Sequence, residues 1–245
     1  MPGLIRLSAG DLFANDFDIV RVVAEGGMGT IYEARDRTDG QVCALKVLHI
    51  QLVADEQSRR RFQQESQVSA KIASRYVPRV FRAGVDPHSG TPFISMELLL
   101  GRDLRRFVTE RGPVPIEEAR RIFEQVTHAL AAAHRIGLVH RDLKPENIFL
   151  RETGGPTEVK LLDFGVAKLL DLHQTSGAGT GAVGSPLWMA PEQTSAGGRI
   201  APATDNWALG LVSFYVLTGA LYWKAAQGDS GVAGLLREIH LDPIA

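Results

Sequence analysis

The sequence predicts an α+β fold in which a small antiparallel sheet is followed by a mainly helical region. Short strand-like runs separated by turns fill residues 17–48, and helical patterns dominate after residue 103. Between these helices lies a polar loop, residues 140–147, that concentrates the reactive side chains. With 245 residues, the chain is long enough for one large domain or for two smaller lobes.

Composition excludes several classes of function. Apolar residues make up 44% and charged residues 22%, as in soluble globular proteins, and the net charge of −1 argues against a nucleic-acid or anionic-membrane surface. Cys43 is the only cysteine, so no internal disulfide or thiolate metal cluster can form. The histidines show no metal-ligand spacing, and the first residues lack an export-signal pattern. We therefore expect a cytoplasmic protein.

The first three strands are expected at 17–24, 30–35 and 41–48, as an antiparallel meander. The turn at 25–29 contains three glycines, whose backbone N–H groups can approach an anion closely. Alone this signal is weak, because such a hairpin is more often an ordinary turn. Lys46 closes an otherwise apolar strand, and a buried ammonium needs a carboxylate or a phosphate. Glu65, in a helix expected at 55–73, is the candidate carboxylate; the alternative is a surface acid on a charged helix.

Further elements are expected along the rest of the chain. Residues 97–103 follow two more strands, and their exposed backbone could hydrogen-bond a flat heterocycle, as a hinge between lobes would. The prolines at 113 and 115 precede a helix whose first turn carries Glu117 and Glu118, which suit its positive N-terminus. The expected strands are 80–85, 93–96, 148–150 and 159–162, and the expected helices are 103–111 and 116–136.

The loop at residues 140–147 combines three groups suited to phosphate chemistry. Asp142 can accept a proton, Lys144 can contact a phosphate oxygen, and the amide oxygen of Asn147 suits Mg²⁺. Pro145 disfavours a helix there, so a bent loop can aim Asp142 and Asn147 at one point. Asp163 follows an apolar strand and precedes Phe-Gly, which suits a metal ligand.

The segment from 207 to 223 is almost wholly apolar, with tryptophan at both ends. Two interpretations are open: a short membrane span, at the lower limit of length, or the buried helix of a large soluble domain. We favour the buried helix. Before it, residues 172–185 are rich in Gly, Ser and Thr and have no periodicity, which predicts a loop.

Taken in order, these segments resemble the serine/threonine protein kinases, in particular their bacterial branch. The resemblance runs from about residue 17 to the end of the chain. It implies a two-lobed protein-kinase-like fold. The N-terminal lobe, residues 1–98, would hold an antiparallel sheet and one long helix. The C-terminal lobe, residues 99–245, would be mostly helical and would lack its last helices.

The resemblance also implies roles, with ATP and Mg²⁺ as cofactors and a protein with Ser or Thr as substrate. Asp142 would accept the proton of the substrate hydroxyl, Lys144 would steady the transferring phosphate, and Lys46 would pair with the α- and β-phosphates while held by Glu65. Asn147 and Asp163 would hold the metal ions. The nucleotide would contact Gly26, Gly27, Gly29, Ile31, Ala44, Lys46, Met96, Glu97, Leu99, Asp103 and Phe149.

The same resemblance implies a signalling role with possible regulation by phosphorylation, including autophosphorylation. Arg141 would bind a phosphate added to the loop before residue 186. The acceptors would be Thr175, Ser176 or Thr180, with Thr180 preferred. Ser185, where the family commonly has threonine, would contact the acceptor region.

Three departures from the family pattern keep other functions open. Ala24 replaces the usual first glycine of the phosphate loop, Leu100 replaces an acidic hinge residue, and the chain stops at Ala245 before the arginine that would pair with Glu192. Arg199 and Arg237 lie in the wrong contexts to replace it. The alternatives to an active kinase are therefore a non-catalytic ATP-binding scaffold and an inactive fragment whose apolar helix needs a partner or a membrane.

Overall fold

A computed structural model of the chain describes residues 6–27, 29–49, 60, 62, 66, 68–152, 154–155, 157–164, 186–195, 197–227 and 231–241. The chain divides into two compact units. One comprises Met1–Lys71 and Pro78–Leu99, and the other comprises Ile72–Val77 and Leu100–Ala245.

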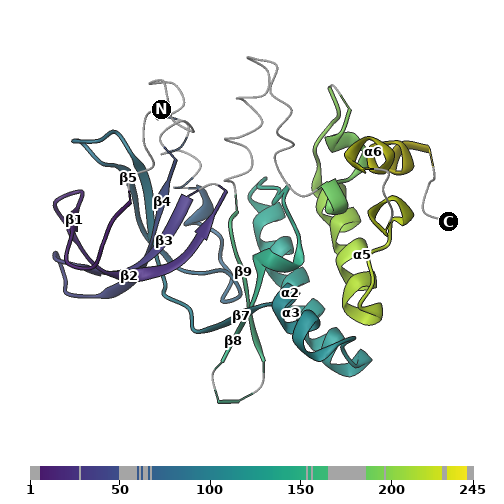
Figure 1. The fold of residues 1–245 in the computed structure, drawn as a ribbon, viewed down its shortest axis with the longest axis horizontal. Helices are drawn as coiled ribbons and strands as arrows, with labels where there is room; N and C mark the ends of the chain where they lie inside the picture. The colour runs from purple at the N-terminus through teal and green to yellow at the C-terminus, as the bar shows by residue number, and fades with distance from the viewer. Residues whose placement is uncertain are drawn as a thin grey trace. The chain divides into compact units, whose positions relative to one another are not determined.

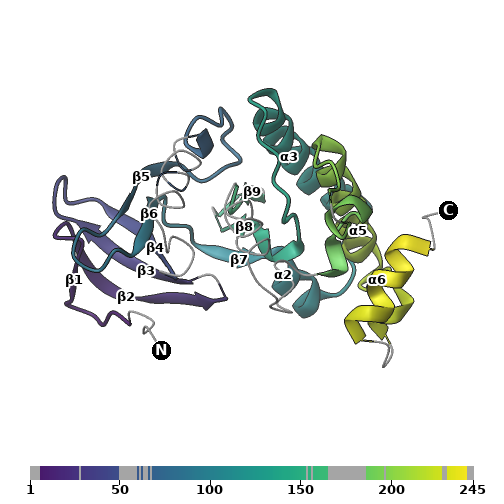
Figure 2. The ribbon, with the colours of Figure 1, turned by 90° about the horizontal axis from the view of Figure 1, so that it is seen from above.

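The first unit is built on a six-stranded antiparallel sheet with the strand order β1-β2-β3-β4-β6-β5 (Figure 1; all six strands are labelled in Figure 2). The predicted meander and the two later strands are confirmed, and β2 and β3 extend further into their shared turn than the sequence predicted. The strands are β1 (Leu12–Phe13), β2 (Phe17–Gly26), β3 (Gly29–Asp36), β4 (Val42–Leu48), β5 (Val80–Val85) and β6 (Pro92–Met96).

Aromatic and aliphatic side chains from one face of this sheet form its core. Phe93 on β6 meets the rings of Phe13 and Phe17 edge to face, with centroids 5.6 and 5.4 Å apart. The alternating residues Cys43, Leu45 and Val47 of β4 join the same cluster, as expected for a strand with one buried face. This packing fixes β4, the strand that carries Lys46.

The helix predicted at 55–73 lies mostly outside the described residues. Those described between 60 and 69 are helical, and Phe62 among them is buried. The helix does not reach residue 73 as predicted, because residues 70 and 71 already form a turn.

The second unit combines a three-stranded sheet, ordered β7-β8-β9, with the longer helices. The helices predicted after residue 103 are confirmed: Asp103 caps the first, since its Oδ1 accepts the N–H of Arg106 at 2.8 Å. The elements are β7 (Gly101–Asp103), α2 (Leu104–Arg111), α3 (Ile116–Arg135), η2 (Pro145–Asn147), β8 (Ile148–Arg151), β9 (Glu158–Leu161), η3 (Pro186–Trp188), η4 (Pro191–Gln193), α5 (Pro202–Thr218), η5 (Lys224–Gln227) and α6 (Gly231–Leu241).

Helices α3 and α5 lie alongside each other in this unit (Figure 2). The predicted bounds of the apolar helix, 207–223, were wrong: α5 begins at Pro202, and Gly219, at φ 72°, ends it in a left-handed cap. Trp223 is buried beyond the helix, and its indole N–H donates to the carbonyl of Leu187. Among the described residues, no helix has the length and apolar character needed to cross a bilayer.

Candidate active site

The loop at 140–147 is fixed to the second unit by a buried carboxylate on α5. Asp205 is 1% exposed, and its Oδ1 accepts the N–H of Arg141 at 2.9 Å. Its Oδ2 accepts the N–H of His140 at 2.9 Å and contacts His134 Nε2 at 2.7 Å. Because buried backbone N–H groups need acceptors, Asp205 determines where the loop begins.

The imidazole of His140 connects the loop to the strand end that precedes Asp163. Its Nε2 lies 2.7 Å from the carbonyl of Leu162, and its Nδ1 lies 3.3 Å from the N–H of Asp142. A carbonyl only accepts and an N–H only donates, so the proton of the neutral ring is assigned to Nε2. The ring is fully buried and meets Phe164 edge to face, with centroids 4.7 Å apart.

Two of the candidate site residues have positive φ although they are not glycine: Arg141 at 68° and Asp163 at 61°. Such a conformation costs about 1–3 kcal/mol and persists only where neighbours enforce it. Asp205 accepts the N–H of Arg141, and Gln193 Nε2 donates to the Arg141 carbonyl at 2.7 Å, so both backbone polar groups of Arg141 are held. Leu162 comes just before Asp163; its carbonyl accepts a hydrogen bond from His140 Nε2, and its N–H donates to the carbonyl of Asn147.

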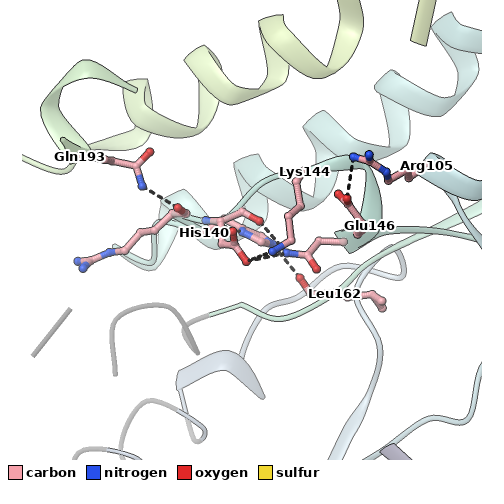
Figure 3. Close-up of polar contacts among 9 residues, drawn as sticks. Arg105, His140, Lys144, Glu146, Leu162 and Gln193 are labelled. Atoms are coloured by element: carbon pink, nitrogen blue, oxygen red, sulfur yellow. Dashed lines mark hydrogen bonds and ion pairs between the residues drawn. The ribbon is translucent and has the colours of Figure 1, made fainter. Parts of the chain in front are cut away.

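Asp142, Lys144 and Asn147, predicted to act together, are in contact (Figure 3). The Oδ2 of Asp142 lies 2.7 Å from Lys144 Nζ and accepts from Asn147 Nδ2 at 3.2 Å. The same Nδ2 donates to the backbone carbonyl of Asp142 at 2.6 Å, across the short turn η2. Arg105 on α2 pairs with Glu146 at 3.1 Å and ties this turn to the helix.

Asn147 and Asp163, predicted as metal ligands, lie on adjoining backbone segments. The N–H of Leu162 donates to the carbonyl of Asn147 at 2.8 Å, which places the next residue, Asp163, close to this turn. Both acceptors of the Asn147 amide nitrogen are oxygens, so its Oδ1 is the atom left for a cation. One amide oxygen and one carboxylate fit Mg²⁺, which binds few protein groups and takes further oxygens from phosphates and water. In the described part of the chain, no group of three or more His, Cys, Asp or Glu side chains is arranged so that it could hold a metal ion by itself.

In the first unit, the glycine-rich turn contains two kinds of glycine. Gly29, at φ 154°, is required by the sheet, because a Cβ there would lie 2.2 Å from the carbonyl oxygen of Val47. Gly26 would meet only the Gly29 carbonyl, at an ordinary 3.7 Å, and Gly27 would meet nothing within 4 Å. Neither has positive φ, so the fold itself does not demand glycine at positions 26 and 27.

Lys46 lies in the middle of the sheet and is only 6% exposed. It stands opposite Ile31 on β3 and Ile94 on β6. Two residues earlier on β4, Ala44 pairs with Met96. The sheet thus gathers four of the residues predicted to contact a nucleotide, namely Ile31, Ala44, Lys46 and Met96.

The segment after β6 begins with Glu97, whose N–H donates to the carbonyl of Arg79 at 2.9 Å. The Glu97 carboxylate accepts the N–H of Arg79 in return. Leu99 ends the first unit. In the second unit, Asp103 and Phe149, both predicted to contact the nucleotide, stand opposite each other on β7 and β8.

Several predicted residues lie outside the described part of the chain: Glu65, Thr175, Ser176, Thr180 and Ser185. Glu192, for which the sequence offered no arginine partner, accepts a hydrogen bond from the Thr204 hydroxyl at 2.6 Å.

Sequence reasoning missed three residues that hold the loop: Asp205, Gln193 and the imidazole of His140. An acid in the first turn of a helix is normally explained by the helix dipole, and Asp205 fitted that explanation. Its partners, His140 and Arg141, lie 65 and 64 positions away in the sequence. The one available signal was a charged residue just before an apolar run, which predicts burial and therefore a partner.

Comparison with known proteins shows which families and proteins this chain resembles. The profile of the protein kinase domain matches residues 17–242. The chain is 36% identical over 236 residues to the probable serine/threonine-protein kinase PknB of Corynebacterium glutamicum, covering 95% of this chain and 35% of that protein. It is 36% identical over 220 residues to the serine/threonine-protein kinase PknL of Mycobacterium tuberculosis, covering 90% of this chain and 53% of that protein. The chain thus spans about a third to a half of the length of these curated relatives.

Solved structures show the same fold. The crystal structure of the Mycobacterium tuberculosis PknI kinase domain matches with a TM-score of 0.72 and 30% sequence identity. The match covers 88% of this chain and 79% of that one.

Proposed function

The chain belongs to the protein kinase domain family, in its bacterial serine/threonine branch, and from this premise we propose that it transfers the γ-phosphate of ATP to serine or threonine hydroxyls of a protein. One observation carries the proposal. Asp142, Lys144 and Asn147 are in direct contact, and the backbone hydrogen bond from Leu162 to Asn147 brings Asp163 to the same turn.

Asp142 is the proposed base that orients the substrate hydroxyl and accepts its proton. Both of its side-chain contacts, to Lys144 and Asn147, are made by Oδ2. We therefore assign Oδ1 to the substrate hydroxyl. Lys144 holds an ammonium beside this carboxylate, where it can neutralise charge on the phosphoryl group during transfer.

Asn147 and Asp163 are the proposed Mg²⁺ ligands, because the oxygen donors that they supply suit this ion. Held by these two residues, Mg²⁺ would supply positive charge to neutralise the phosphates of the nucleotide. The chain's own contribution is to hold the two oxygens still. The Asn147 amide is anchored through its nitrogen to Asp142, and Asp163 is fixed through the bonds of Leu162.

The first unit supplies most of the proposed nucleotide contacts, and Asp103 and Phe149 belong to the second unit. Glycine at positions 26 and 27 has no structural requirement in the sheet, which is the pattern expected where a phosphate approaches the backbone. Lys46 is the proposed partner of the α- and β-phosphates, with Glu65 as its carboxylate. The base and ribose would contact Ile31, Ala44, Met96, Glu97, Leu99, Asp103 and Phe149; since Asp103 Oδ1 caps α2, a ribose contact would use its Oδ2.

We further propose a cytoplasmic signalling role with regulation by phosphorylation. Thr175, Ser176 and Thr180 are the proposed acceptors, Thr180 first, and autophosphorylation is one route to them. Arg141 is the proposed phosphate partner, because arginine makes strong bidentate bonds to phosphate.

The test is phosphorylation of dephosphorylated casein by the purified chain with radiolabelled ATP, with and without Mg²⁺. We expect Mg²⁺-dependent transfer to Ser and Thr, reduced about 10²–10³-fold or more in Asp142→Asn. The control is Asp18→Asn, a half-exposed aspartate of β2, which should retain activity. Transfer that survives Asp142→Asn would remove the assigned base. ATP binding without any transfer by the unmodified chain would instead indicate a nucleotide-binding scaffold.

A further inference from the structure

We propose that Gln193 is a positioning residue that sets the plane of the peptide between Arg141 and Asp142 and thereby aims the Asp142 carboxylate. The inference rests on the proposed function of Asp142. Figure 3 shows the Gln193 side chain, from η4, reaching toward the loop that carries His140 and Lys144.

Both ends of the Gln193 amide are used. Its Nε2 donates to the Arg141 carbonyl at 2.7 Å, and its Oε1 accepts the N–H of Ala190 at 3.0 Å. A side chain bonded at both polar atoms cannot rotate without losing a bond. The Gln193 side chain is therefore held in one orientation between η4 and the loop.

The peptide that Gln193 holds is bonded at both of its polar groups. Its carbonyl belongs to Arg141, and its N–H belongs to Asp142. The N–H donates to His140 Nδ1 at 3.3 Å, beyond the usual length of such a bond, whereas the carbonyl bond to Gln193 is 2.7 Å. Gln193 thus makes the stronger of the two bonds to this peptide.

The restraint matters because the residue before Asp142 is strained. Arg141 has φ 68°, a conformation that relaxes at a non-glycine residue unless neighbours enforce it. Asp205 fixes the N–H of Arg141 but not its carbonyl. Without Gln193 the peptide could turn, and the direction of the Asp142 side chain would turn with it.

The chain offers a matched control in Gln125 on α3. Its Nε2 donates to the carbonyl of Thr157 at 3.0 Å, and its Oε1 accepts the N–H of Val159 at 2.9 Å. Gln125 thus bonds in the same way, in the same unit, to the β8–β9 connection and the start of β9 instead of the loop, and its Nε2 also donates to the Arg121 carbonyl of its own helix at 3.1 Å. Replacing Gln193 removes one donor bond and one acceptor bond, and replacing Gln125 removes the same two kinds of bond and one further donor bond, so a general loss of stability affects the control at least as much.

The experiment compares Gln193→Met, Gln193→Glu and Gln125→Met in the full chain. Methionine keeps the length and removes both bonds, whereas glutamate keeps the acceptor for Ala190 and sets a carboxylate against the Arg141 carbonyl. We expect kcat to fall about 10- to 100-fold in both Gln193 variants, with KM for ATP within about twofold, because misplacement of a reacting group lowers the rate of transfer more than nucleotide binding. Gln125→Met should lower Tm at least as much as Gln193→Met and leave kcat unchanged.

A second readout does not depend on activity. Amide hydrogen exchange in a peptide spanning 138–147 should be faster in both Gln193 variants and unchanged in Gln125→Met. Unchanged exchange there, or an equal loss of kcat in Gln125→Met, would overturn the role of Gln193. If the unmodified chain transfers no phosphate but exchange is faster in the Gln193 variants, the proposed function is refuted. The restraint of the loop by Gln193 is then still supported.

Discussion

Replacing Asp205 by asparagine tests whether one carboxylate fixes the loop at residues 140–147. The substitution keeps shape and volume but supplies one accepting oxygen where the structure uses two. Oδ1 serves Arg141, and Oδ2 serves His140 and His134. Whichever way the amide turns, its NH₂ group faces a backbone N–H that needs an acceptor.

The cost follows from these contacts. In the better orientation the amide oxygen keeps His140, and the N–H of Arg141 is left buried without an acceptor, at about 1–3 kcal/mol. The bonds that remain lose their charge assistance, which adds roughly 1–3 kcal/mol. Removing a buried charge offsets part of this. We expect a net loss of about 2–4 kcal/mol, a large share of a domain's usual 5–15 kcal/mol.

Urea unfolding followed by tryptophan fluorescence measures this loss. All three tryptophans, Trp188, Trp207 and Trp223, lie in the second unit, so the signal reports the unit that contains Asp205. Thermal unfolding should shift down by roughly 4–16 °C. The control is Asn206→Ala, an exposed position on the same helix turn, expected within about 0.5 kcal/mol of the unmodified chain. A stability of Asp205→Asn equal to that of this control would refute the reasoning.

Two further predictions concern the first unit. Gly29→Ala should destabilise this unit by about 3 kcal/mol or more, because the new Cβ would lie 2.2 Å from the Val47 carbonyl oxygen. Gly27→Ala should leave urea unfolding unchanged and weaken only ATP binding, which calorimetry measures. Equal unfolding curves for the two variants would contradict this prediction. Burial opposes ionisation of Asp86, but hydrogen bonds from the Ser89 hydroxyl and two backbone N–H groups outweigh it and lower the pKa of this carboxyl. Ionised Asp86 therefore stabilises the fold above the ordinary aspartate pKa of about 3.9, and this contribution is lost as pH falls through the lower folded-state value. The stability difference between the unmodified chain and Asp86→Asn, from urea unfolding at several pH values, should be constant from pH 5 to 7 and shrink below about pH 4; a difference that widens there would show the opposite sign.

Much of the fold could be predicted from local patterns. Strands β2 to β6 of the first sheet follow from alternation and turn residues, whereas the two-residue β1 was not predicted. Helix α3 follows from its prolines, its two acidic residues and its apolar period. The apolar segment at 207–223 led to a wrong C-terminal boundary, because the sequence stays apolar as far as Trp223 although the helix ends at Gly219. A left-handed cap depends on backbone geometry, and glycine in an apolar run does not by itself announce one.

The sequence alone determined which groups this protein has available for chemistry: which carboxylate, ammonium and amide share one loop, and which glycines and lysine accompany them along the chain. These groups are close in sequence, so short-range patterns reveal them. Only the tertiary structure decided how the loop is held. Asp205, Gln193 and His140 bond to backbone groups 64, 52 and 22 positions away, and two of those bonds enforce a positive φ that Arg141 would not adopt alone. Hydrogen bonds of that range depend on how the elements pack, which no local pattern encodes.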